Sequence, residues 1–254
     1  MLKFVKKIFS KSSTPCEANY MVDIGSTEKN CPYCGIALTK FPGRKTECKA
    51  CQNYIYVRTR PSDEQRILVK ESELVRVEEL WAIKNGTHED FLYERKKYDD
   101  EKEFLRRKLN REPTDLDIQL SLLQKQLPVH AENGDWGLYR NSKMSIAKLF
   151  FKTEKYEAAL KEYLEVQFID LNGPNNAIRM NGVPLKGYPA FAPDSAFIAP
   201  GIVYEIERTL KKLNRDVASI EDEFISYNEI LRKALKLPLS AKTAWEKLKR
   251  DCEW

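Results

Sequence analysis

The chain has 254 residues, enough for one large domain or for a small domain followed by a larger one. Hydrophobic residues make up 42% of it and charged residues 32%, which is typical of a soluble protein with a buried core. No segment approaches the roughly 18 consecutive apolar residues of a transmembrane helix, and no secretory cleavage motif follows the first apolar run. The net charge of +5 is concentrated in residues 1–70, which carry thirteen lysines and arginines against six acidic residues.

Residues 1–23 consist of a basic amphipathic segment and a linker. The apolar side chains that would share one helical face of residues 1–11 are Leu2, Val5, Ile8 and Phe9. So short an apolar face gives only weak, reversible membrane binding. The alternatives are a docking peptide, a short helix packed on the protein itself and a frayed terminus.

Residues 24–62 contain two C-x-x-C pairs separated by thirteen residues. The four cysteines are Cys31, Cys34, Cys48 and Cys51. Two such pairs on two turns can place four thiolates at the corners of a tetrahedron around one metal ion. Zinc is the expected ion, and an iron or [2Fe–2S] centre could use the same sulfurs. Four protein ligands leave no coordination position open, so the site should be structural. Thiols of this kind also favour a reducing, cytoplasmic location.

The stretch Cys31-Pro32-Tyr33-Cys34-Gly35 resembles a rubredoxin-type knuckle. Together the two pairs resemble a zinc ribbon, the family in which two such knuckles lie at the tips of short β-hairpins. The second knuckle departs from the pattern, because Gln52-Asn53 replaces the usual glycine, although asparagine also adopts positive φ. The resemblance implies a small β module with one structural zinc ion. The alternating sequence YIYVRTRP, which Pro61 ends, predicts one of its strands.

Basic and aromatic residues are interleaved around the second knuckle. The candidates for phosphate contacts are Lys40, Arg44, Lys45 and Lys49. Lysine and arginine neutralise phosphates, and aromatic rings provide stacking platforms for the bases of a single strand. The alternative is that the lysines offset the negative charge of a four-thiolate zinc site and that the rings form the small core of the module.

Residues 63–254 are predicted to form a larger all-α domain, because helical periodicity and helix-ending residues replace the strand pattern after Pro61. A helix over residues 112–127 should kink or end at Pro128. Two helices with almost no connection cover residues 138–172. The last three predicted helices cover residues 197–213, 219–235 and 240–252.

The helical hairpin of residues 141–172 resembles a single tetratricopeptide repeat. Small side chains at Ala147 and Ala159 would allow its two helices to approach closely. Lys143 in place of the early tryptophan and a late Pro174 depart from the pattern. A lone repeat cannot bury both of its faces, so neighbouring helices must cap it. The resemblance implies a protein-binding region, and an ordinary helical hairpin is the alternative.

Residues 173–194 are rich in glycine, proline and asparagine. Their apolar side chains would be costly to leave in water, so we expect an ordered loop that packs across the helical domain and borders its main groove. The residues expected to line that groove are Asn175, Asn176, Arg179 and Tyr188. The asparagines could equally cap backbone groups.

The sequence contains no motif for nucleotide binding, nucleophilic catalysis or zinc-dependent proteolysis, and its two histidines are near no cysteine or serine motif. The layout also loosely resembles uncharacterised zinc-ribbon proteins of Gram-positive bacteria and their phages, a resemblance that implies no activity. We therefore favour a non-catalytic zinc-ribbon adaptor that binds a protein partner through its helical domain. The first alternative is a nucleic-acid-binding accessory protein that uses the basic module. The second is an enzyme whose carboxylate site forms across helices.

Overall fold

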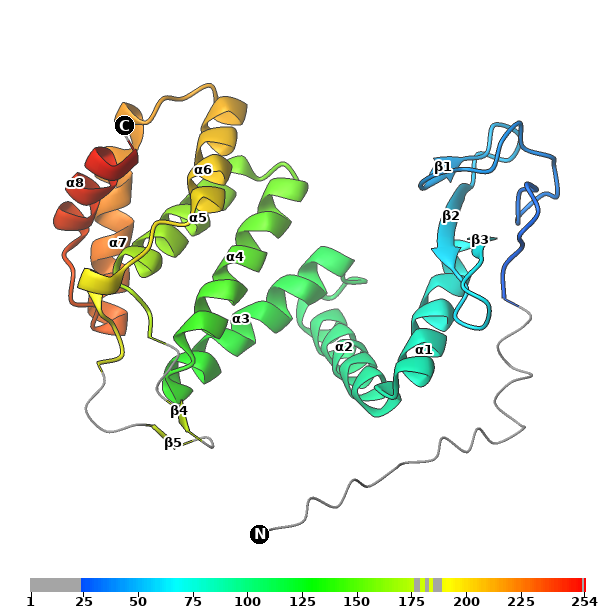
Figure 1. Cartoon of the computed structure of the whole chain (residues 1–254), viewed down its shortest axis with the longest axis horizontal. Coiled ribbons are helices and arrows are strands. Elements are labelled where there is room, and N and C mark those ends of the chain that lie inside the picture. The colour runs from blue at the N-terminus through cyan, green and yellow to red at the C-terminus, as the bar shows by residue number, and fades with distance from the viewer. Residues whose placement is uncertain (1–23, 176–178, 181–182, 185–188, 253) are drawn as a thin grey trace, which may run out of the picture. The chain divides into compact units, whose positions relative to one another are not determined.

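The computed structural model describes the chain except residues 1–23, 176–178, 181–182, 185–188 and 253 (Figure 1). The chain divides into two compact units, Met1–Lys97 and Tyr98–Trp254. Within the described residues, no helix combines the length and the apolar character that crossing a membrane requires. The basic amphipathic segment, residues 1–11, lies outside the described residues.

The first unit contains a three-stranded antiparallel sheet followed by helix. Its elements are β1 (Thr46–Glu47), β2 (Tyr54–Thr59), β3 (Arg66–Val69), the 3₁₀ turn η2 (Glu71–Glu73) and α1 (Leu74–Asn85). The strand order is β1-β2-β3, and Tyr56 of β2 lies opposite Val69 of β3. The predicted strand before Pro61 is therefore confirmed as β2.

The two faces of this sheet bury different clusters, because side chains alternate along a strand. Ile55 and Leu68 are buried in a cluster that includes two of the cysteines. Ile67 and Val69 are buried in a second cluster with Val77 of α1. The sheet thus lies between the cysteines and the first helix.

The predicted domain boundary at residue 62 does not coincide with the division between the units. β3 lies after residue 62 and completes the sheet, and α1 covers that sheet, so the compact unit extends to Lys97. The region after residue 62 is consequently not all-α. The strand β3 could not be predicted from its sequence RILV, because Ile67, Leu68 and Val69 are all buried and show no alternation of apolar and polar residues.

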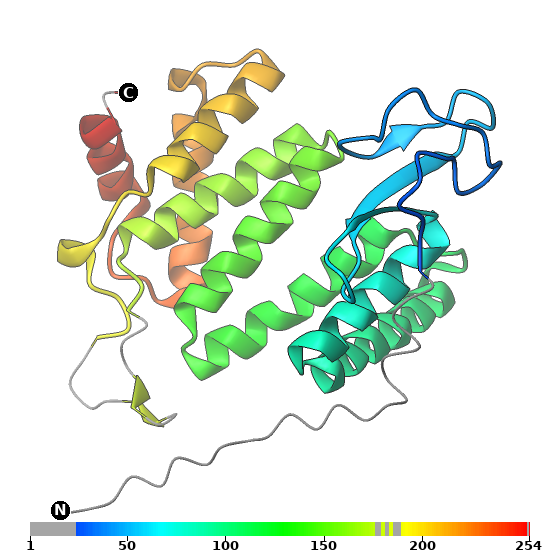
Figure 2. The same ribbon diagram turned by 45° about the vertical axis from the view of Figure 1, so that its right-hand side comes forward.

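The second unit is mainly helical. Its helices are the last part of α2 (His88–Leu109), α3 (Asp115–Asn133), α4 (Trp136–Lys152), α5 (Tyr156–Leu171), α6 (Pro200–Leu213), α7 (Glu221–Leu235) and α8 (Ala241–Cys252). α5 packs against α4 on one side and against α6, α7 and α8 on the other, and α3 packs on α4 (Figure 2). Every residue from Tyr163 to Leu171 is buried, so α5 forms the centre of this unit's core.

Two helix boundaries differ from the prediction. α3 does not end at Pro128, which was one of the two outcomes predicted there, but continues for more than a turn beyond it. Pro128 is exposed, and its neighbours Leu127 and Ala131 pack against the core, so this packing outweighs the loss of a backbone hydrogen bond. α6 begins at Pro200 rather than at residue 197, because the fixed φ of proline suits the first position of a helix.

α4 and α5 form the helical hairpin predicted at residues 141–172, and they lie side by side in both views (Figures 1 and 2). Ala147 and Ala159 are fully buried, with 0% of each side chain exposed. Small side chains at these positions let the two backbones approach closely. The hairpin is therefore present, and its resemblance to a tetratricopeptide repeat stays a prediction.

The described parts of residues 173–194 form a hairpin rather than an irregular loop. At its base the amide of Ala192 donates to the carbonyl of Gly173 at 2.9 Å, and the amide of Asn175 donates to the carbonyl of Ala190 at 3.0 Å. Farther out, β4 (Arg179–Met180) pairs with β5 (Val183–Pro184). Figure 2 shows these two strands beyond the ends of the helices, whereas Phe191 at the base of the hairpin is buried in the core of the helical unit. Ladder pairing satisfies the strand backbone without helix contacts.

Lys143 lies in a buried ion cluster between α4 and α5. Its Nζ is 2.7 Å from Oε2 of Glu162 and also contacts the carboxylate of Glu165. Lys143 and Glu165 are each only 7% exposed. Burial lowers the pKa of Lys143, but the two carboxylates outweigh burial and raise it. Burial also raises the pKa of Glu162 against the opposing effect of Lys143. One shared ammonium therefore compensates two carboxylates inside the hairpin.

Replacing Lys143 with alanine should destabilise the helical unit by about 3–5 kcal/mol at neutral pH, because buried carboxylates are left without a cation. Without the ammonium, the folded-state pKa of Glu162 should rise further above its unfolded value. A carboxyl group whose pKa is higher in the folded state than in the unfolded state stabilises the protein at low pH. This contribution to the free energy of unfolding decreases as pH rises. The destabilisation should therefore be smaller at pH 5 than at pH 7, in urea unfolding followed by tryptophan fluorescence.

The matched control is Lys148→Ala, which removes an exposed lysine from the same helix. Its effect on the free energy of unfolding should stay within about 0.5 kcal/mol. An equal loss of stability for Lys143→Ala at both pH values would contradict the buried cluster.

Candidate metal centre

The first cysteine pair is held in a tight backbone turn. The amide of Gly35 donates to the carbonyl of Cys31 at 2.8 Å, and the amide of Cys31 donates to the carbonyl of Ile36 at 2.9 Å. Gly35 has a φ of +74°, which glycine adopts without steric cost. The chain then turns back, so that Asn30 and Ala37 form an antiparallel bridge. The pair therefore lies at the tip of a short hairpin.

The second pair repeats this turn. The amide of Gln52 donates to the carbonyl of Cys48 at 2.8 Å, and the amide of Cys48 donates to the carbonyl of Asn53 at 2.9 Å. The flanking strands are β1 and β2, which pair antiparallel. We expected asparagine to supply the positive φ in place of glycine. The residue with positive φ is Gln52, at +58°, because it occupies the position equivalent to Gly35.

The two turns bring the four sulfur atoms together. The Sγ atoms of Cys31 and Cys51 are 3.8 Å apart, as are those of Cys34 and Cys48. All four lie within 4.8 Å of one another. A tetrahedron with metal–sulfur bonds near 2.3 Å has sulfur–sulfur edges of about 3.8 Å, whereas a disulfide bond is only about 2.05 Å long. The four predicted ligands therefore fit a single four-coordinate metal ion.

Local hydrogen bonds support the sulfur ligands. The side chain and the backbone amide of Asn53 both hydrogen-bond to Cys51 and, in the absence of a cation, lower its pKa to about 6. The backbone amide of Ile36 acts in the same direction on Cys34. Partial desolvation and the three neighbouring cysteines outweigh that amide and raise the pKa of Cys34 to about 12. Four thiolates this close together thus require a cation to neutralise them.

Burial differs between the inner and outer cysteines. Cys31 is 2% exposed and Cys48 is 1% exposed, and both pack with Ile55 and Leu68 of the sheet. Cys34 is exposed at the rim. The first cysteine of each pair is therefore anchored in the core of the unit, and the sheet fixes the separation of the two turns.

The four basic residues proposed to contact phosphate are all exposed: Lys40, Arg44, Lys45 and Lys49. Lys45 lies over two of the interleaved rings, with its Nζ 4.2 Å from the centroid of Tyr54 and 4.8 Å from that of Tyr56. A hydrogen bond with Tyr56 raises the pKa of this lysine. Part of the basic and aromatic pattern therefore serves contacts within the unit. A role in nucleic-acid binding stays a prediction.

The predicted partner-binding residues do not gather in one described place. Asn175 lines a pocket of about 480 Å³ together with Arg140 and Asp170, whose side chains form a two-bonded ion pair at 2.9 and 2.7 Å. Arg179 lies in β4. The other two residues, Asn176 and Tyr188, lie outside the described part of the chain.

The sequence did not predict that Asn53 forms hydrogen bonds to Cys51. It also did not predict that Arg140 and Asp170 form an ion pair at a pocket. The signal for Asn53 was available, because it follows Cys51 at the distance at which Ile36 follows Cys34. No signal existed for Arg140 and Asp170, which come from different helices and meet only through the packing of α4 on α5.

Comparison with protein families, with curated proteins and with solved structures finds no match to this chain. The interpretation of the site therefore depends on its own geometry.

Purified protein should contain about one zinc or iron ion per chain, because four thiolates form one tetrahedral site. Cys48→Ser should lose the ion, since it removes a ligand that is 1% exposed. Chelation should then accelerate hydrogen exchange of amides in residues 24–69, while the amides of α5 stay protected because that helix has its own core. Elemental analysis measures the metal content, and hydrogen-exchange mass spectrometry measures the protection of the amides.

The matched control is Cys252→Ser, because this cysteine lies in α8 and outside the cluster. It should keep the metal content and the exchange pattern of the unaltered protein. An intact protein without zinc or iron would contradict the site.

Proposed function

We propose that this protein is a non-catalytic adaptor in which a zinc-ribbon unit is stabilised by one structural zinc ion and the helical unit binds a protein partner. The observation that carries the zinc assignment is the close approach of four sulfur atoms on two equivalent turns. Zinc accepts four thiolates in tetrahedral geometry and has no redox chemistry. Iron with the same ligands is the competing ion.

A structural role is supported by the number of ligands. A catalytic zinc ion keeps one position for water or substrate, whereas four cysteines complete its coordination shell. The ion would therefore supply folding energy to a small unit rather than a reactive water molecule. Metal-bound cysteines that form no disulfide are in keeping with a reducing cytoplasm.

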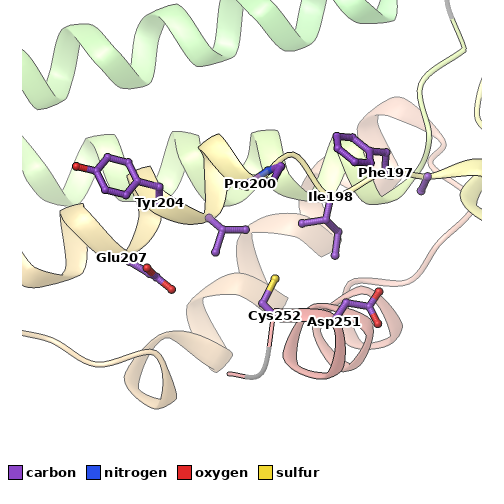
Figure 3. A pocket seen from close by; sticks show the side chains of 9 residues that line it. Phe197, Ile198, Pro200, Tyr204, Glu207, Asp251 and Cys252 are labelled. Atoms are coloured by element: carbon purple, nitrogen blue, oxygen red, sulfur yellow. The ribbon is translucent and has the colours of Figure 1, made fainter.

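The partner-binding role is supported by an apolar pocket in the helical unit (Figure 3). Phe197 is 70% exposed and Tyr204 is 61% exposed, and both line this pocket. Large aromatic side chains are frequent anchors in protein interfaces. Two exposed rings in one concave surface are therefore better explained by a partner than by isolated surface positions.

The rim of this pocket indicates the chemistry of the partner. Glu207 of α6 and Asp251 of α8 border the apolar floor, and Asp251 extends from the opposite wall in Figure 3. No lysine or arginine lines the pocket among the described residues. A segment with apolar side chains and flanking lysines or arginines would complement this surface.

The pocket also adjoins residues 173–194, which the sequence predicts to border the main groove of the helical domain. Phe197 lines both this pocket and the one that contains Asn175. A partner anchored at Phe197 could therefore extend toward the base of the 173–192 hairpin. This geometry supports one continuous binding surface centred on Phe197.

A photo-reactive phenylalanine analogue at position 197 should cross-link one discrete protein in cells, through a peptide that is apolar and basic. The same analogue at position 230 should not, because Ile230 is equally exposed, at 68%, but lies outside the pocket. Tyr204→Ala should weaken binding of the captured protein by about 2 kcal/mol, as expected for an aromatic anchor. Equal cross-linking from both positions, or a captured peptide of acidic character, would contradict the adaptor role.

The second candidate function is nucleic-acid binding by the zinc-ribbon unit. It is supported by the exposure of Lys40, Arg44, Lys45 and Lys49, none of which forms an ion pair with a described carboxylate. Exposed cations that no carboxylate neutralises are available to phosphates, although Lys45 also contacts Tyr54 and Tyr56.

If these four residues contact phosphates, single-strand affinity should fall with salt at a log–log slope of about −3, or roughly −0.7 per contact. Replacing all four with alanine should flatten this slope. The control replaces four exposed lysines elsewhere in the chain: Lys96, Lys161, Lys233 and Lys242. Fluorescence anisotropy that detects no binding at about 50 mM salt would remove this candidate.

A further inference from the structure

A second pocket of about 480 Å³ opens among the C-terminal half of α4, the start of α5 and α6. Its lining combines four cationic side chains, two carboxylates and three aromatic rings. α4 and α6 both pack against α5, so the pocket walls belong to one packed core. Its volume lies within the range of about 300–1,000 Å³ that is usual for small-molecule sites.

The charges that line this pocket are unbalanced. The cations are Lys148, Lys152, Arg208 and Lys212, and the carboxylates are Glu154 and Glu205, which leaves a net charge of +2. Among the described residues, only Arg208 of these four cations forms an ion pair. The pocket therefore presents unneutralised positive charge, which favours an anionic ligand of similar charge.

Arg208 is held in position before any ligand arrives. Its guanidinium carbon lies 4.2 Å from the ring centroid of Phe151, and one nitrogen is 3.3 Å from a carboxylate oxygen of Glu205. The guanidinium carries five N–H donors, and a stacked, oriented fork matches two oxygens of a phosphate. Most of those donors remain available to a ligand.

Tyr163 adds a neutral donor on the same pocket wall. The residue is only 1% exposed, and no described group forms a hydrogen bond with its hydroxyl. Burial and the nearby Glu205 raise the pKa of this phenol to about 12, so it stays protonated at neutral pH. A hydroxyl that lines a cationic pocket and has no hydrogen-bond partner among the described residues is suited to donate to an anion.

The rings of the pocket contribute structure rather than a stacking surface. Arg208 covers one face of Phe151, and Tyr156 packs edge-on against Phe151 with the ring centroids 5.2 Å apart. Tyr163 is buried. The pocket therefore selects for the charged group of a ligand and not for a planar base.

We propose that this pocket binds the phosphate group of a small phosphomonoester. A phosphomonoester carries about −1.5 to −2 charges at neutral pH, which matches the surplus of the pocket. Arg208 provides the oriented pair of donors, Lys148, Lys152 and Lys212 provide charge, and the Tyr163 hydroxyl donates one further hydrogen bond. This site shares no residue with the cysteine cluster or with the Phe197 pocket.

The test is calorimetric titration of the full-length protein with glycerol 3-phosphate and with AMP. Both should bind with affinities within about tenfold of each other, and glycerol and adenosine should not bind. Arg208→Gln should weaken both by about tenfold or more, and Tyr163→Phe by about fivefold, because each removes a hydrogen bond to a charged group. Lys152→Gln should also weaken binding of both probes. This variant leaves the packing of Arg208 on Phe151 unchanged.

The control is Arg232→Gln, which removes an arginine that is paired with a glutamate on α7 and lies outside the pocket. It should bind both probes as the unaltered protein does. Lowering the pH from about 7.5 to about 5 should weaken binding of glycerol 3-phosphate, because its second ionisation is near pH 6, whereas sulfate binding should change less. Binding of adenosine equal to that of AMP, equal affinity for a dinucleotide phosphodiester, or unaltered binding by both Arg208→Gln and Lys152→Gln would overturn the proposal.

Discussion

The first unit depends on one electrostatic constraint, which is the approach of four thiol groups to within 4.8 Å. Thiolates at this distance repel one another unless a cation lies between them, so folding of the two turns and metal binding must be coupled. The constraint extends outward through packing. Ile55 and Leu68 contact the inner cysteines, and the opposite face of the same sheet carries α1. An ion at the centre would thus fix the positions of the two turns. The turns would position the sheet, and the sheet would position the first helix.

The helical unit is organised by a different constraint, the burial of residues 163–171 of α5. Charged groups in or beside a buried stretch are costly unless they are paired. Lys143 of α4 compensates Glu162 and Glu165, and Arg140 of α4 pairs with Asp170 at the other end of the helix. These ion pairs fix the register of α4 against α5, because sliding one helix by a turn would leave buried charges unmatched.

The sequence predicted the features that depend on local spacing. Two C-x-x-C pairs define two turns, and each turn needs only its own residues to form. It did not predict β3, since a strand that is buried on both faces has no alternation, and the boundary predicted at residue 62 therefore precedes this strand. It also left open whether α3 kinks or ends at Pro128, and the helix continues past this residue while Leu127 and Ala131 pack against the core. The pockets could not be predicted because their side chains come from different helices and meet only after those helices have packed.

The hairpin that follows α5 shows how a local backbone requirement can position a distant surface residue. Gly173 has a φ of +62°, and a Cβ atom at this position would lie 2.1 Å from the carbonyl oxygen of Ala192. Only glycine permits this approach, which brings the chain back to the end of α5 after an excursion of nearly twenty residues. Phe197 follows five residues after Ala192 and lines both adjoining pockets. The closed base of the hairpin therefore helps to position Phe197, which is the most exposed aromatic ring among the described residues that follow α5.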